Sequence, residues 1–214
     1  MYARWIGAAF TLCASSWVMQ APAQTEVRGT DAPREDGRAR AAQFMNELML
    51  GKAPVGTPFT LTNQHGKRVS LGDFRGKVVL LYFGYTFCPD VCPTDLLAIA
   101  QTLKSLGKSA DQVQPIFVTL DPARDTRELL RNYAAAFHPR IVALTGSEAE
   151  IRRIATAYKV YYEKITPPDS KTYFINHAAY TFLLDRQGKY VLFFPPGTTP
   201  TRMTAMVRDE LAVK

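Results

Sequence analysis

The sequence predicts a single α/β domain, preceded by an export signal and a polar linker. Val78–Phe83 is an unbroken apolar run of strand length, rich in β-branched and aromatic residues, and such a run is typical of a strand buried on both faces of a sheet. Apolar residues at helical spacing follow it, and Pro115–Leu120 is then a second buried strand. Strand, helix and strand in this order indicate a βαβ unit.

Residues 1–23 are expected to be a signal peptide. Arg4 gives the segment a positive start, Trp5–Met19 is an apolar stretch without charge, and Ala21–Ala23 places small residues where a signal peptidase reads them. We expect cleavage after Ala23, which would leave a periplasmic protein with no stable membrane span. An uncleaved membrane anchor is the alternative, although the apolar stretch is short for a span.

Residues 24–53 are expected to form a polar linker and a short helix. Gln24–Arg40 has a composition typical of disorder, and Ala41–Leu50 fits one short helix. The folded domain then covers residues 54–214, which is long enough for one sizeable core. The formal net charge is +7, but lysine and arginine form no basic cluster with interleaved aromatic residues, so we expect no nucleic-acid partner.

The first half of the domain contains a hairpin, the buried strand and a helix. Phe59–Thr62 and Arg68–Ser70 flank a polar turn and form the hairpin. Gly84 ends the buried strand, and after a short loop Pro93 is placed to be the first residue of a helix that ends at Gly107.

The second half adds strands and helices and closes with a hairpin and a helix. Asp121 and Pro122 end the second buried strand, and Thr126 and Ser147 are suitable N-caps for the two helices that follow. The predicted elements are, in order, helix Thr126–Phe137, strand Ile141–Leu144, helix Ser147–Tyr158, extended segment Val160–Glu163, hairpin Ala179–Leu184 with Tyr190–Phe194, and a final helix opened by Thr199 and Pro200. A βαβ unit followed by a hairpin and a terminal helix is the thioredoxin pattern, so we expect a thioredoxin-like fold with inserted strands.

Two of the three cysteines, Cys88 and Cys92, lie between the buried strand and the next helix. The start of a helix presents unpaired N–H groups and the positive end of the macrodipole, which favour thiolate over thiol. Thiolates bind soft metals and also exchange disulfides. A structural disulfide is the third possibility, and the Cys-x3-Cys spacing alone does not decide among them.

Four segments together resemble the Sco/SenC family of copper-handling proteins. They read FGYTFCPDVCPTDL, LDPARDT, FHPRIVALTG and INHAAYTFLLDRQGKYV. The resemblance extends from about Gly56 to the C-terminus and implies a thioredoxin-like fold. It also implies one copper per chain, as Cu(I) or Cu(II), bound by Cys88, Cys92 and His177. The implied role is to deliver copper to, or prepare, the binuclear copper centre of a cytochrome c oxidase subunit.

The chemistry of these three side chains suits copper, and zinc is a competitor because two cysteines and a histidine also occur in catalytic zinc sites. Asp90 or Asp121 could reach the site as a further ligand. The family usually has Asp before the histidine and Ser or Thr after it, whereas this chain has Asn176 and Ala178. Tuning of His177 by a neighbouring carboxylate is therefore expected to be missing.

The histidines have ordinary alternatives. His177 is expected just before a strand, where a lone histidine is more often a surface or hydrogen-bonded residue than a ligand. The preceding segment, Glu163–Asn176, is expected to be mobile enough to bring the ring in or out. His138 is expected to cap the end of a helix, and His65 is expected to be solvated in a turn.

Four other residues near the cysteines are candidates for supporting roles. Asp121 and Asp125 either orient the cysteine loop or cap the next helix, and capping is the favoured prediction for Asp125. Tyr85 and Phe87 could border a surface that docks a partner.

The rival hypothesis is a periplasmic thiol-disulfide oxidoreductase acting on the cysteines of a copper protein, or a thiol peroxidase. Thioredoxin-type enzymes have two residues between their cysteines, where this chain has three, and peroxiredoxin-like sites have Thr or Ser where this chain has Tyr85. In the periplasm Cys88 and Cys92 should be oxidised unless a metal or a thiol reductant intervenes. His177 discriminates, because a metal site needs it and disulfide exchange does not.

Overall fold

The computed structural model describes residues 46–48, 50 and 54–213. The predicted signal peptide and most of the predicted linker lie outside these residues. Within the predicted short helix, residues 46–48 are helical and Leu48 is buried. Among the helices of the described ranges, none has both the length and the apolar character that a membrane span requires.

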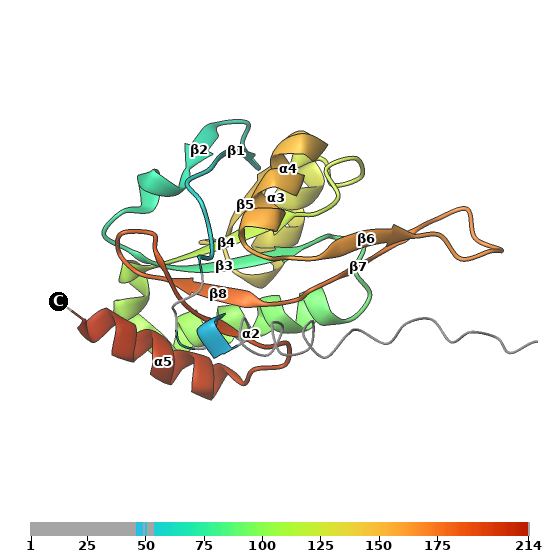
Figure 1. The fold of residues 1–214 in the computed structure, drawn as a ribbon. Helices are drawn as coiled ribbons and strands as arrows, with labels where there is room; N and C mark the ends of the chain where they lie inside the picture. The colour runs from blue at the N-terminus through green and yellow to red at the C-terminus, as the bar shows by residue number, and fades with distance from the viewer. Residues whose placement is uncertain (1–45, 49, 51–53, 214) are drawn as a thin grey trace, which may run out of the picture.

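A seven-stranded sheet forms the centre of the domain, in the order β2-β1-β5-β4-β3-β8-β9 (Figure 1). β3 (Val78–Gly84) lies in its interior, parallel to β4 (Val113–Thr119) and antiparallel to β8 (Thr181–Leu184). Every residue of β3 is buried, so the prediction of a strand covered on both faces is confirmed. The remaining strands are β1 (Thr60–Asn63), β2 (Arg68–Ser70), β5 (Val142–Thr145) and β9 (Tyr190–Phe194).

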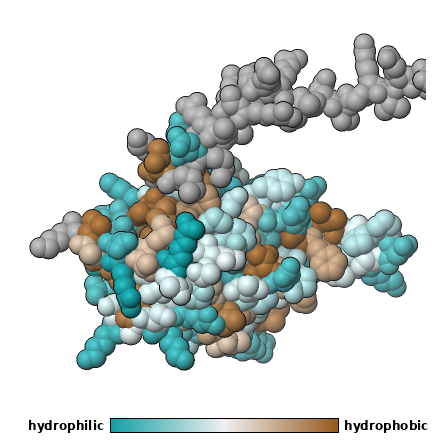
Figure 2. All heavy atoms as spheres, turned by 90° about the horizontal axis from the view of Figure 1, so that it is seen from below, coloured by the Kyte–Doolittle hydropathy of each residue, from teal (hydrophilic) through white to brown (hydrophobic). Residues whose placement is uncertain are grey.

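Helices cover both faces of this sheet. α2 (Val91–Leu106) and α5 (Pro200–Ala212) pack together on one face, and α3 (Arg127–Phe137) and α4 (Glu148–Ala157) lie on the other (Figure 1). Seen from the side of α2 and α5, hydrophobic side chains form separate patches among hydrophilic ones (Figure 2). The order β3-α2-β4, followed later by β8-β9-α5, confirms the thioredoxin-like fold with inserted strands.

The N-terminal ends of α3 and α4 agree with the sequence prediction, and that of α2 differs from it by two residues. Thr126 and Ser147 are the N-caps of α3 and α4, as predicted, and each side chain accepts a hydrogen bond from a backbone N–H in the first turn. α2 begins at Val91, so Pro93 is its third residue and not its first. Short 3₁₀ turns lie at Leu71–Phe74 and Gly107–Gln112.

The main departure from the sequence prediction is a two-stranded ribbon that projects from the body (Figure 1). It consists of β6 (Tyr162–Ile165) and β7 (Phe174–His177), which are antiparallel with Tyr162 opposite His177. β6 overlaps the predicted extended segment Val160–Glu163, whereas no strand is predicted over Phe174–His177, and His177 is the last residue of that strand. Each strand has only four residues, which is too short for a clear alternation of apolar and polar side chains.

Asp125 ties the loop after β3 to the end of β4. Its buried carboxylate accepts hydrogen bonds from the N–H (3.1 Å) and hydroxyl (2.6 Å) of Thr86 and from the hydroxyl of Thr119. The favoured prediction that Asp125 caps α3 is therefore wrong, because Thr126 already fills that position. Thr86 is two residues before Cys88, so Asp125 orients the cysteine loop.

We expect Asp125→Ala to lower the free energy of unfolding by about 3 kcal/mol, because two hydroxyls and a backbone N–H would lose a charged acceptor inside the protein. Urea unfolding followed by circular dichroism measures this change. Asp111→Ala is the matched control: that carboxylate is 83% exposed and pairs with Arg140, so its loss should cost less than about 1 kcal/mol. Equal costs for the two substitutions would contradict the role given to Asp125.

Candidate metal centre

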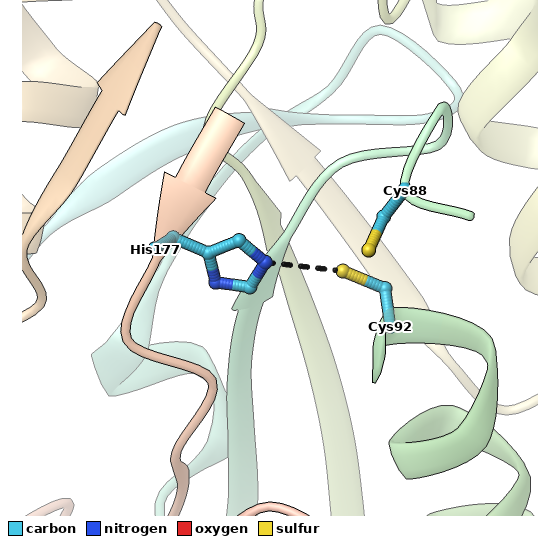
Figure 3. Close-up of side chains that lie close together, drawn as sticks. All are labelled: Cys88, Cys92 and His177. Carbon is cyan, nitrogen blue, oxygen red and sulfur yellow. Dashed lines mark hydrogen bonds between the residues drawn. The ribbon is translucent and has the colours of Figure 1, made fainter. Parts of the chain in front are cut away.

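The structure brings Cys88, Cys92 and His177 together. Their ligand atoms all lie within 4.8 Å of one another, and no other group of three such side chains is found in the described part of the chain. Cys88 lies in the loop after β3, Cys92 in the first turn of α2, and His177 at the end of β7 (Figure 3). Three separate elements therefore converge on one point.

The sulfur of Cys92 lies against the end of β3. A β-carbon on Gly84 would be 2.8 Å from Cys92 Sγ and 3.0 Å from the rings of Phe117 and Tyr82. Since Gly84 has no side chain, the sulfur can occupy this space. Because Gly84 has no side chain, Cys92 in the first turn of α2 can pack against the end of β3.

The two thiols have different electrostatic environments. Hydrogen bonds from the thiol of Cys92, from His177 and from backbone N–H groups at the start of α2 lower the pKa of Cys88 to about 4, although burial opposes this. The pKa of Cys92 is raised, chiefly because its thiol donates a hydrogen bond to Cys88 and because it is buried. In the reduced protein these effects favour the thiolate on Cys88 and the thiol on Cys92. Neither forms a disulfide in this structure.

His177 directs its Nε2 atom at the cysteines. Nε2 lies 3.3 Å from Cys92 Sγ (Figure 3), and Nδ1 is buried without a hydrogen-bond partner among the described residues. The side chain of Asn176 is exposed, as the alternation of β7 requires. Positions 176 and 177 therefore point to opposite sides of the strand, and Asn176 carries no charge, so no carboxylate at position 176 tunes His177.

The other candidate ligands have different roles. Asp121 is buried in an ion pair with Arg124 and accepts a hydrogen bond from the hydroxyl of Tyr173. Asp90 is exposed at the N-cap of α2 and does not belong to the group of ligand atoms. Among the described residues, only the two cysteines and His177 can act together as ligands.

The remaining histidines behave as predicted. His138 is the C-cap residue of α3, and its Nδ1 accepts a hydrogen bond from the N–H of Arg140. His65 is exposed in the turn between β1 and β2. Both lie outside the group at the cysteines.

Two residues near Cys92 were not singled out in the sequence. Asp95 is one helical turn after Cys92, is buried, and accepts a hydrogen bond from the N–H of Gly197 (3.1 Å). Burial raises the pKa of Asp95 and that of Tyr82. The i, i+3 spacing of Cys92 and Asp95 on α2 was the available signal, because it places both on one face of the helix.

This set of donors fits copper. Two sulfurs can hold Cu(I) at low coordination number, and the imidazole nitrogen with a solvent oxygen meets the preferences of Cu(II). The same donors also suit zinc, so the choice between metals needs evidence beyond the ligands.

Known proteins supply that evidence. A family model described as SCO1/SenC matches residues 48–212. A SCO2-like protein of Rickettsia prowazekii is 38% identical over 155 residues, which cover 72% of this chain and 75% of the relative.

Solved structures agree with the sequence matches. The structure of Bradyrhizobium japonicum ScoI with copper bound is similar, with a TM-score of 0.67 and 42% identity, over 73% of this chain and 99% of that one. BsSco, described as a member of the Sco family of cytochrome c oxidase assembly proteins with a disulfide switch, has a TM-score of 0.59 and 26% identity, over 76% of this chain and 98% of that one. The chain therefore belongs to the SCO1/SenC family.

Proposed function

We propose that this protein is an exported copper metallochaperone that delivers copper to, or prepares, the binuclear copper centre of a cytochrome c oxidase. The observation that carries the proposal is the convergence of Cys88, Cys92 and His177 within 4.8 Å, in a family whose similar member from Bradyrhizobium japonicum was solved with copper bound. The role in oxidase assembly rests on what is stated of the relative BsSco.

Each of the three ligands has a distinct part in holding the cargo. Cys88, the more accessible sulfur, is already a thiolate and is the first soft donor that an arriving ion meets. Cys92, buried at the start of α2, must lose a proton to become the second. His177 adds the nitrogen that Cu(II) favours.

The site sits on a protein that we propose to be exported. The predicted signal peptide over residues 1–23 supports periplasmic localisation, with an uncleaved anchor as the alternative. In that compartment the two thiols need either a bound metal or a thiol reductant to stay reduced, so a periplasmic thiol reductant is part of the proposal.

One observation favours the second candidate, a thiol-disulfide oxidoreductase. The low pKa of Cys88 makes it a nucleophile, and the neighbouring Cys92 could resolve a mixed disulfide. His177 contributes to the copper function and is not needed for exchange, so the two functions can be separated experimentally.

Substitution of either cysteine should abolish stoichiometric copper binding. Cys88→Ser and Cys92→Ser replace a soft sulfur by a hydroxyl that coordinates copper poorly. Elemental analysis after reduction and dialysis should give one copper per wild-type chain and almost none in either variant. Zinc supplied in competition is the control for metal identity. Unchanged copper stoichiometry in both variants would refute the ligand assignment.

His177→Ala should separate copper handling from thiol exchange. The variant is expected to lose Cu(II) affinity by at least about tenfold and to change its absorption spectrum, whereas Cu(I) held by two thiolates should be affected less. The thiol-disulfide potential should stay nearly constant because both sulfurs remain. In cells, oxidase assembly should fail in this variant and also in the cysteine variants. Normal oxidase activity in this strain would favour the oxidoreductase function.

The pH dependence of alkylation measures the difference in pKa between Cys88 and Cys92 in the reduced, metal-free protein. Cys88, with a pKa of about 4, should react with iodoacetamide at nearly the same rate from pH 6 to pH 8, because it is already a thiolate there. Cys92→Ser keeps a hydroxyl that can donate to Cys88 and should preserve this flat profile. Cys92→Ala removes the donor, so the pKa of Cys88 should rise and the rate should fall towards acidic pH. Identical profiles for the two variants would show that Cys92 does not stabilise the Cys88 thiolate.

A further inference from the structure

We propose that Tyr85 and Arg124 are positioning residues for His177, which they hold at the metal centre by fixing the backbone of β7. This inference deepens the proposed copper function and rests on it. Neither residue lies among the potential ligands. Their role follows from where their polar atoms meet the strand that carries the histidine.

Tyr85 contacts both the strand and the imidazole ring. Its side chain is 2% exposed, and its hydroxyl oxygen accepts a hydrogen bond from the N–H of Ile175 at 3.2 Å, two residues before His177. Its ring meets that of His177 edge-on, with centroids 5.9 Å apart and an interplanar angle of 81°. Tyr85 also lies three residues before Cys88, so one side chain links the cysteine loop to the histidine strand.

Arg124 holds the residue that precedes β7. Its Nη1 donates to the carbonyl of Tyr173 at 2.9 Å, and its guanidinium lies 3.7 Å from the centroid of the Tyr173 ring. Asp121 fixes this arrangement, because it pairs with Arg124 and accepts a hydrogen bond from the Tyr173 hydroxyl at 2.7 Å. The guanidinium also lies 4.8 Å from the ring centroid of Phe87, which belongs to the cysteine loop.

The ribbon depends on these contacts because it is not part of the main sheet. β6 and β7 pair only with each other, so no ladder of backbone hydrogen bonds fixes β7 to the core. The outward side chains of the ribbon, including Ile165 and Phe174, are exposed. On the side of β6 the ribbon contacts α4, through the ion pair of Lys164 with Glu148 and through Arg152 over the ring of Tyr162. On the side of β7, the buried Ile175 and the two polar contacts at Tyr173 and Ile175 place His177 beside the sulfurs.

The experiment compares Tyr85→Phe with Tyr133→Phe. Tyr85→Phe keeps the ring and removes only the acceptor for Ile175. Tyr133→Phe is the matched control, since the Tyr133 hydroxyl is also buried but has no hydrogen-bond partner among the described residues. Arg124→Lys keeps the positive charge but loses the planar guanidinium donor. Its control is Arg140→Lys, because the guanidinium of Arg140 pairs with Asp111 and not with a residue of the site.

Two readouts are used. Amide exchange over residues 172–178 is measured in the metal-free protein, and Cu(II) and Cu(I) affinities are measured with the Cu(II) absorption spectrum. In Tyr85→Phe, exchange at Ile175 should accelerate, Cu(II) affinity should fall about three- to tenfold, and the spectrum should shift towards that of His177→Ala. Cu(I) affinity should change less than about twofold. Arg124→Lys should act in the same direction, and both controls should match the wild type.

The outcomes separate this inference from the proposed function. If the wild type binds copper and His177→Ala alters its Cu(II) spectrum, but Tyr85→Phe matches Tyr133→Phe in both readouts, the positioning role is refuted and the copper function stands. The positioning role is also refuted if amide exchange in Tyr85→Phe is faster while Cu(II) binding is unchanged, or if Cu(II) binding weakens while amide exchange is unchanged. If the wild type binds no copper, the proposed function fails, and the exchange measurement still decides whether Tyr85 fixes β7.

Discussion

The close approach of α2 to the end of β3 is the constraint on which the metal centre depends. β3 is the buried interior strand, and its last residue, Gly84, leaves the space in which the Cys92 sulfur lies. The carbonyl of Gly84 accepts a hydrogen bond from Leu120 at 2.7 Å, which joins this point to the end of β4. The position of Cys92 is therefore set by the core, and the loop that carries Cys88 is in turn fixed by Asp125.

This arrangement makes the two cysteines unequal. Cys92 is wholly buried against the strand, whereas Cys88 is partly exposed. A single proton shared by the two neighbouring sulfurs stays on Cys92, because burial penalises the thiolate form of that cysteine. Cys88 is the better thiolate because it accepts hydrogen bonds from backbone N–H groups at the start of α2. A soft cation that binds both sulfurs must displace that proton, so copper binding and proton release are linked.

Much of this could be predicted from the sequence, and each failure has a physical cause. The buried strand, the caps at Thr126 and Ser147, and the position of the cysteines follow from local patterns that hold along one segment. The role of Asp125 depends on a contact with Thr86, which is distant in the sequence, whereas β6 and β7 are neighbours that are each too short to show an alternating pattern. Local propensity made Asp125 a plausible cap, but the donors Thr86 and Thr119, which lie 39 and 6 residues away in sequence, decided its role.

The three ligands differ in how firmly the fold holds them, and this bears on the release of the cargo. Cys92 belongs to a helix packed on the core, whereas His177 belongs to a ribbon that few contacts join to the body. Loss of those contacts would cost far less than unfolding β3 or α2, because local opening follows the contacts that must be broken. Cu(I) can stay on two thiolates when the imidazole leaves, but Cu(II) favours the nitrogen. The oxidation state of the copper therefore determines how strongly the ribbon contributes to holding it.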